Sequence, residues 1–228
     1  MHPINIGLIF ISGLNVGLAF LIWSRNFKNK INISFSLGLF FVAIWTLGIA
    51  MFRESQTESV ALVWTWVQNF SGSLIVIPFF LFSLYFPYQN RVLKLWQWIL
   101  ILISIIIIFL VVVVSNVWIK DIRLIPHDND YSINFWGILY FNIHFYFYLV
   151  LAFWNLLKKY KDSQGFTRKQ LRYLTISSGI IALFGGIFGA FIPLIMLSTA
   201  GPYWVGPYFS LPLVVYLSWF ISKKEIKC

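Results

Sequence analysis

Chemistry inside a membrane or an active site needs ionisable side chains, and this chain offers few of them. Its long charge-free apolar stretches contain one histidine, His144, and no Asp, Glu, Lys or Arg. A metal site needs at least three protein ligands, and a proton relay needs several acids or histidines. No nucleophile-elbow motif accompanies the serines, and the last stretch has no Lys for a retinal Schiff base. We therefore expect no catalytic residue, no metal and no cofactor, so the chain is not predicted to be an enzyme.

Polar residues within the apolar stretches indicate where a ligand could bind. His144 is flanked by Asn142 and Tyr146, and Gln68 and Asn69 stand together in an earlier stretch. Isolated polar side chains of this kind usually hydrogen-bond to a neighbouring helix, and that is our main interpretation of His144. The alternative hypothesis is a small polar ligand pocket formed by Gln68, Asn69, Asn142 and His144.

The elements that must position these residues are membrane-spanning helices. The 228 residues are 60% hydrophobic and 11% charged, whereas soluble domains average about 25% charged residues. A spanning helix needs about 20 apolar residues, and the unbroken apolar run 99–114 does not alternate as a barrel strand would. We predict an all-α integral membrane protein, a bundle of seven transmembrane helices within residues 1–222. The helices are expected over residues 4–23, 31–52, 60–86, 95–118, 135–157, 174–197 and 203–221, followed by a basic tail at 223–228.

Prolines affect two of these helices. Pro78 lies inside the range 60–86, which is longer than one crossing requires, and predicts a kinked or tilted helix there. The range 203–221 contains Gly206, Pro207 and Pro212, so its helix is expected to begin near Pro207. A bundle of six helices is the alternative.

Lysine and arginine are concentrated in alternate connections, which predicts the orientation. Seven crossings divide the connections into two sets, and one set together with the tail holds fourteen of the 17 basic residues. Short loops rich in Lys and Arg stay in the cytoplasm, so the N-terminus is expected outside and the C-terminus inside. The net charge of +10 is then explained by topology and by attraction to anionic lipids, and we expect no nucleic-acid partner. The fourteen are Arg25, Lys28, Lys30, Arg91, Lys94, Lys158, Lys159, Lys161, Arg168, Lys169, Arg172, Lys223, Lys224 and Lys227.

Short motifs predict the form of two connections. The outer connection 119–134 contains Pro126-His127-Asp128-Asn129-Asp130, whose spacing is not that of an EF-hand calcium loop. We expect a solvated loop there. In the longest inner connection, Thr167-Arg168-Lys169-Gln170 has the spacing of a capping box, so the sixth helix is expected to begin at about Thr167.

Aromatic and small residues predict the surroundings of the helices. Tryptophans near the ends of the apolar stretches, among them Trp45 and Trp118, fit belts at the membrane–water interfaces. Gly185, Gly186 and Gly189 lie in the sixth stretch, where small residues let helices approach closely. This pattern indicates close packing, either within the bundle or between two copies in a homodimer.

Several segments, taken in order, resemble one family. The second helix closes with Ala43-Ile44-Trp45-Thr46-Leu47-Gly48, and the third runs from Trp64-Thr65-Trp66-Val67-Gln68 to Ile77-Pro78-Phe79-Phe80-Leu81-Phe82-Ser83-Leu84-Tyr85-Phe86. Arg168-Lys169-Gln170-Leu171-Arg172-Tyr173-Leu174, a glycine-rich sixth helix and Gly206-Pro207 follow. Over residues 5–222 this combination resembles the seven-transmembrane N-terminal region of bacterial sensor histidine kinases. The resemblance implies an extracytoplasmic-facing or intramembrane sensor that passes a signal down its last helix to a cytoplasmic output domain.

The expected function follows from this resemblance together with the lack of catalytic signatures. Neither a phospho-acceptor histidine, nucleotide-binding glycines nor a heptad linker is found in the sequence, so we expect a module of a longer protein or a free-standing relative with a separate partner. It would be a non-catalytic input module in the bacterial cytoplasmic membrane, in contact with lipids and with a cytoplasmic output domain or signalling partner. A small multi-pass transporter or permease, and a structural membrane subunit, are the alternatives.

Overall fold

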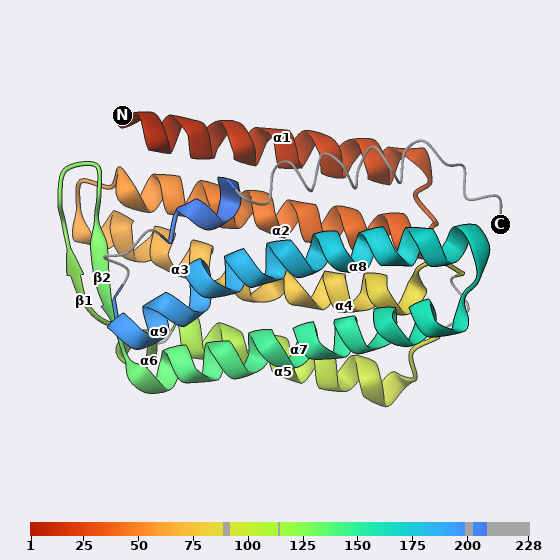
Figure 1. Ribbon diagram of the computed structural model, residues 1–228. Helices are drawn as coiled ribbons and strands as arrows, with labels where there is room; N and C mark the ends of the chain where they lie inside the picture. The colour runs from red at the N-terminus through yellow and green to blue at the C-terminus, as the bar shows by residue number, and fades with distance from the viewer. Residues whose placement is uncertain (89–91, 114, 199–202, 209–228) are drawn as a thin grey trace.

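The computed structural model describes residues 1–88, 92–113, 115–198 and 203–208. They form a bundle of long helices with a small β-hairpin at one end (Figure 1). The elements in chain order are α1 (Pro3–Arg25), α2 (Lys30–Arg53), α3 (Glu58–Leu74), α4 (Val76–Tyr85), α5 (Leu95–Val113), α6 (Ser115–Trp118), β1 (Ile119–Arg123), β2 (Asp130–Ile133), α7 (Phe135–Asp162), α8 (Gly165–Gly186), a π-helical turn (Ile187–Phe191) and α9 (Ile192–Met196).

Six helical segments of the described chain are long and apolar enough to cross a membrane. They are Pro3–Arg25, Lys30–Arg53, Glu58–Tyr85, Leu95–Val113, Phe135–Asp162 and Gly165–Met196, and they fall on the first six ranges expected from the sequence. Large apolar side chains such as Phe10, Leu100 and Trp154 are exposed on their outer faces. An apolar exterior over helices whose backbone groups bond internally suits a bilayer. Most of the expected seventh helix, from residue 209 onward, lies outside the described residues.

Two of the expected helices are interrupted. The segment Glu58–Tyr85 breaks at Ile75, between α3 and α4. Pro78 explains the break, since it has no N–H to donate to the carbonyl of Leu74 four residues earlier. In the range 95–118, α5 ends at Val113 and the short α6 carries Trp118 into the protein interior, where it is 1% exposed. The expectation that Trp118 belongs to an interfacial belt was therefore wrong.

The connections gather at two opposite ends of the bundle (Figure 1). The hairpin end holds the start of α1, the connection between α2 and α3, the β-hairpin and the end of α9. The basic end holds the connections from α1 to α2, from α4 to α5 and from α7 to α8. Every described basic residue of the lysine- and arginine-rich set predicted above lies at or near this basic end, so charge is segregated along the bundle.

The connection 119–134 is an ordered β-hairpin, not the solvated loop expected from the sequence. β1 and β2 pair antiparallel, with Asp121 opposite Ser132 and Arg123 opposite Asp130. Alternate residues of β2 point into the bundle, because Tyr131 and Ile133 are 2% and 1% exposed. The hairpin thus covers the end of the bundle with its own apolar side chains.

The long α8 rod starts and ends differently from the prediction. It begins at Gly165, whose φ is +57°, and no side chain caps it. The capping box expected at Thr167 is therefore wrong, since Thr167 already lies inside the helix. At the other end the rod passes through the π-helical turn into α9, and Ile133 N donates to Leu197 O at 2.8 Å. The rod therefore connects the basic end directly to strand β2.

Buried apolar residues form a large cluster near each end of the bundle and a smaller one between α1 and α2, made of Ala19, Ile22 and Leu39. The cluster at the hairpin end includes Leu8, Phe52 and Trp118, and the cluster toward the basic end includes Phe82 and Leu156. At the hairpin end α2 and α3 are in close contact, since a Cβ on Gly48 would lie 2.8 Å from Gln68 Cβ. This close contact fixes the position of Gln68 against α2.

At the basic end, Lys159 binds the end of another helix. Its Nζ donates to the carbonyl oxygens of Ser83 at 2.8 Å and Leu84 at 2.7 Å, and also to that of Phe86. Carbonyls at a helix C-terminus lack intrahelical partners and carry partial negative charge. Lys159 of α7 therefore holds the end of α4, a role that its place among the predicted loop charges did not reveal.

Candidate functional site

Arg53, in the last turn of α2, is a buried cation at the hairpin end. Only 3% of the residue is exposed, and its Nε donates to Asn5 Oδ1 at 2.8 Å. Its guanidinium forms an ion pair with Asp128 in the turn of the hairpin and lies 5.8 Å from the centre of the Trp204 ring. A buried charge is costly unless it is paired, so Arg53 draws these three partners together.

Glu54, the next residue, accepts hydrogen bonds from two other segments. Its Oε1 accepts from the backbone N of His2 at 2.8 Å and from Asn5 Nδ2 at 2.7 Å. His127 Nδ1 lies 2.8 Å from Oε2. Burial alone would raise the pKa of Glu54, but these hydrogen bonds and the charge of His127 lower that pKa to about 2. Glu54 therefore stays ionised and joins the start of α1 to the hairpin turn.

Asn129 attaches the hairpin turn to the connection between α2 and α3. Its Nδ2 donates to the carbonyl of Phe52 at 2.8 Å and to that of Ser55 at 2.7 Å, and its Oδ1 accepts from Ile125 N at 2.8 Å. We call the set Asn5, Arg53, Glu54, His127, Asp128 and Asn129 the clasp. The clasp is a polar network that ties three separate segments together at one end of the bundle.

Tyr131 of β2 extends from the hairpin into the bundle. Its hydroxyl oxygen accepts from Asn69 Nδ2 at 2.8 Å, and Gln68 Nε2 lies 3.4 Å away. Its ring packs edge-on against Phe52, with 5.3 Å between the ring centres. Burial raises the pKa of Tyr131 to about 12, although the hydrogen bond from Asn69 opposes this, so the hydroxyl stays protonated. Tyr131 therefore links the clasp to α3.

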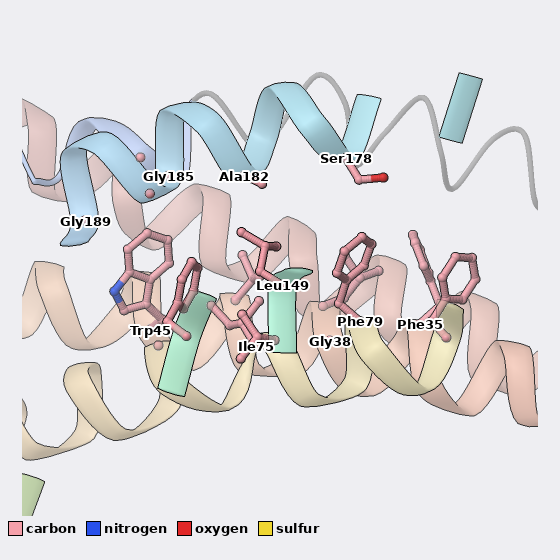
Figure 2. A pocket seen from close by; sticks show the side chains of 18 of the residues that line it. Phe35, Gly38, Trp45, Ile75, Phe79, Leu149, Ser178, Ala182, Gly185 and Gly189 are labelled. Carbon is pink, nitrogen blue, oxygen red and sulfur yellow. The ribbon is translucent and has the colours of Figure 1, made fainter. Parts of the chain in front are cut away.

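Next to the Asn69 partner of Tyr131 the bundle contains a cavity of about 190 Å³ lined by residues of α2, α3, α4, α7 and α8. Figure 2 shows Ala182, Gly185 and Gly189 on one side and Trp45, Ile75 and Phe79 on the other. Most lining side chains are aromatic or aliphatic, and the polar ones are Ser34, Gln68, Asn69 and Ser178. A second cavity of about 20 Å³, shared by Gln68, Asn69 and Tyr131, lies toward the hairpin. That volume suffices for about one water molecule.

The cavity lining changes two expectations from the sequence. Trp45 lines the cavity and does not belong to an interfacial belt. Gly185, Gly186 and Gly189, expected at a close helix contact, also line the cavity. A Cβ on Gly186 would lie 3.1 Å from Tyr146 Oη and one on Gly189 3.6 Å from Trp45 Cζ2, as close packing predicts, whereas a Cβ on Gly185 would meet nothing within 4 Å. Open space beneath α8 is therefore found at Gly185.

The four residues of the predicted polar pocket separate into two pairs. Gln68 and Asn69 line the cavity, whereas Asn142 and His144 are absent from the described residues around it. Asn142 donates to Ile138 O on its own helix, and the His144 ring packs against Tyr148. Helical spacing explains the difference, because Phe141, Phe145 and Leu149 recur every four residues and form the α7 face toward the cavity.

The sequence reasoning missed the clasp and Tyr131. The sequence pattern does not single out Arg53 or Glu54, and it predicts a solvated loop where the structure has the hairpin. One signal for the hairpin was present, since Tyr131-Ser132-Ile133 alternates apolar and polar residues after a turn-forming stretch. In the part of the chain that the structure describes, no group of three His, Cys, Asp or Glu side chains could hold a metal ion.

Glu54 gives the clasp a defined pH dependence. Because its pKa in the folded protein lies near 2, below the ordinary value of 4.5, its stabilisation is present above about pH 4.5 and is lost as the pH falls toward 2. We predict that the melting temperature of the purified protein falls more steeply from pH 5 to pH 3 than that of Glu54→Gln. Glu58→Gln, at an exposed site four residues on, should follow the wild type. Parallel curves for the wild type and Glu54→Gln would contradict this role.

A comparison with protein families identifies the family of the chain. The family model described as the N-terminal 7TM region of histidine kinase matches residues 7–219, and the search of curated proteins found no match. The match confirms the resemblance drawn from the sequence motifs. The chain therefore belongs to the family of N-terminal seven-transmembrane regions of histidine kinases.

Proposed function

We propose that this chain is a non-catalytic sensory input module that passes a signal from the hairpin end to a cytoplasmic output domain or signalling partner at the basic end. The family supports a membrane sensor. The observation that carries the proposal is the continuous connection from the clasp, through β2, into two helical rods that reach the basic end. These rods are α7 and the rod formed by α8, the π-helical turn and α9. The bacterial cytoplasmic membrane is the proposed location, with surrounding lipid and a second copy as further partners.

The charge distribution supports an orientation for this module. The described Lys- and Arg-rich connections lie at the basic end (Figure 1), and such loops stay in the cytoplasm. The clasp and the hairpin then face the outside, with the N-terminus. A seventh crossing within residues 203–221 would return the chain to the cytoplasm, where the tail 223–228 would lie beside the output partner.

Strand β2 is connected to both rods. Its chain continues directly into α7, whose Lys159 holds the end of α4. Its edge also bonds to the end of α9, since Ser132 and Ser198 form a β-bridge and Ser198 Oγ donates to the Asp130 carboxylate at 3.0 Å. A shift of the hairpin would therefore move α7 and the α8–α9 rod together.

The π-helical turn Ile187–Phe191 is the place where the α8–α9 rod can adjust. Turns of this kind interrupt the regular helical bonding and recur at functional sites. Gly189 within it faces the cavity and lies on the Trp45 ring, since a Cβ there would be 3.6 Å from Trp45 Cζ2. We propose that the rod has two packed positions, and that the clasp biases which one is occupied.

The proposed orientation predicts which introduced cysteines react from outside the cell. In a Cys228→Ser background, Asp121→Cys on the hairpin should react with a membrane-impermeant maleimide in intact cells. Lys158→Cys at the basic end should react only after the membrane is permeabilised. Both native side chains are exposed, so a difference reports the side of the membrane. The reverse pattern would overturn the orientation.

The proposed signal route predicts that loosening the clasp changes kinase output. The whole chain is fused through its C-terminus to the catalytic region of a histidine kinase, and autophosphorylation is measured in membrane vesicles. Asp128→Asn weakens the partner of buried Arg53, so the rate should change about fivefold or more, as expected for coupling between two states.

Asp121→Asn is the matched control. It removes the same charge from the same hairpin, and the two Asp side chains are 65% and 66% exposed. Among the described residues, Asp121 has only a 4.0 Å ion pair with the exposed Arg123, so its variant should match the wild type. Equal rates for both variants and the wild type, at equal protein levels, would count against the route.

A further inference from the structure

The cavity beneath α8 has room for one small organic molecule. Its volume is about 190 Å³, and an apolar protein cavity of roughly 150 Å³ is known to hold benzene. The space therefore suits about eight non-hydrogen atoms, such as one ring with two small substituents. The aromatic and aliphatic lining, including Phe35, Phe79, Phe145 and Leu149, favours an apolar body.

Gln68, one of the residues that line the cavity, carries a hydrogen-bond acceptor that has no partner among the described residues. Gln68 is 2% exposed, and its Oε1 makes no hydrogen bond with the described residues. Its Nε2 is directed to Tyr131, and the Asn69 amide is engaged with Thr65 and Tyr131. An unsatisfied buried acceptor costs about 1–3 kcal/mol, and a ligand hydroxyl or N–H would satisfy it.

The wall beside Gln68 is built around one indole ring. A Cβ on Gly72 would lie 3.0 Å from Trp45 Cδ1, and a Cβ on Gly206 would lie 3.1 Å from Trp45 Cη2. Gly189 lies on the same ring, at 3.6 Å by the same measure. Three glycines from separate segments thus leave just enough space for Trp45, so the ring is held in place and gives the cavity a defined shape.

We propose that this cavity is a binding site for a small lipophilic molecule of about one ring that carries a single hydrogen-bond donor, with the donor on Gln68 Oε1. The apolar body lies against Trp45 and Phe79, and the donor lies beneath Tyr131. That such a molecule is the stimulus of the sensor rests on the proposed function. Its binding does not, because Gln68, Trp45 and Phe79 form the proposed site without reference to a signal or an output partner.

The test uses two probes of equal shape. 4-Methylphenol carries one donor, and para-xylene has a methyl group in its place. Binding of labelled 4-methylphenol to the whole chain in lipid nanodiscs is measured by equilibrium dialysis, with empty nanodiscs giving the background partition into lipid. We expect saturable binding with one site per chain, and para-xylene should compete about tenfold less well, the value of one hydrogen bond.

Three variants assign the site. Gly185→Leu fills open space in the cavity wall and should abolish saturable binding. Gly17→Leu makes the same change at an exposed position of α1 where a Cβ also meets nothing within 4 Å, so it should bind like the wild type. Gln68→Leu should bind both probes with similar affinity, because the acceptor is gone.

Three results would overturn the proposal. They are binding to the wild type that does not saturate, equal affinity of the wild type for the two probes, and unchanged binding by Gly185→Leu. A cavity that serves to hold a lipid acyl chain would give the second of these results. An acyl chain has no hydrogen-bond donor at its end, so such a cavity would not distinguish the two probes. If the wild type does not bind while Asp128→Asn still alters kinase output, the ligand site is refuted and the proposed sensor function stands.

Discussion

A buried guanidinium determines how one end of this membrane protein is built. Arg53 ends the largely apolar helix α2, and its side chain is 4% exposed. Such a charge persists only if the chain supplies its partners. Asn5, Asp128 and Trp204 come from three distant parts of the sequence, so satisfying Arg53 brings the start of α1, the hairpin turn and the segment after α9 together. Glu54 and Asn129 then extend the same network along the backbone.

This network connects the hairpin to the helices that would carry the signal in the proposed sensor. The hairpin cannot shift without changing the surroundings of Arg53. It also carries Tyr131, whose hydroxyl bonds to Asn69 in the wall of the cavity. The same strand is joined to α7 and to α9, so the clasp, the cavity and both rods share one element. At the far end Lys159 couples α7 to α4. A ligand in the cavity and a shift of the hairpin would therefore both act on the same helices, α7 and the α8–α9 rod.

The sequence predicts the membrane bundle well because length, hydropathy and loop charge act locally. It places the described spanning helices, the break near Pro78 and the family. It does not predict the hairpin, since the pairing of β1 with β2 depends on the fit of Tyr131 and Ile133 into the end of the bundle. It groups Gln68 and Asn69, which line the cavity, with Asn142 and His144, which are not among its described lining residues. A polar residue in a span does not reveal which face of its helix meets the cavity. The pairing of Arg53 with Asp128, 75 residues apart, has no local signal.

We expect the hairpin and the cavity to be coupled through the hydroxyl of Tyr131, which bonds to Asn69 in the cavity wall. A double-mutant cycle of Tyr131→Phe and Asn69→Leu tests it most directly, with the free energy of unfolding measured in detergent mixtures for the wild type, both single variants and the pair. The account predicts a coupling free energy of about 1 kcal/mol. Single effects that add to within about 0.3 kcal/mol would contradict it.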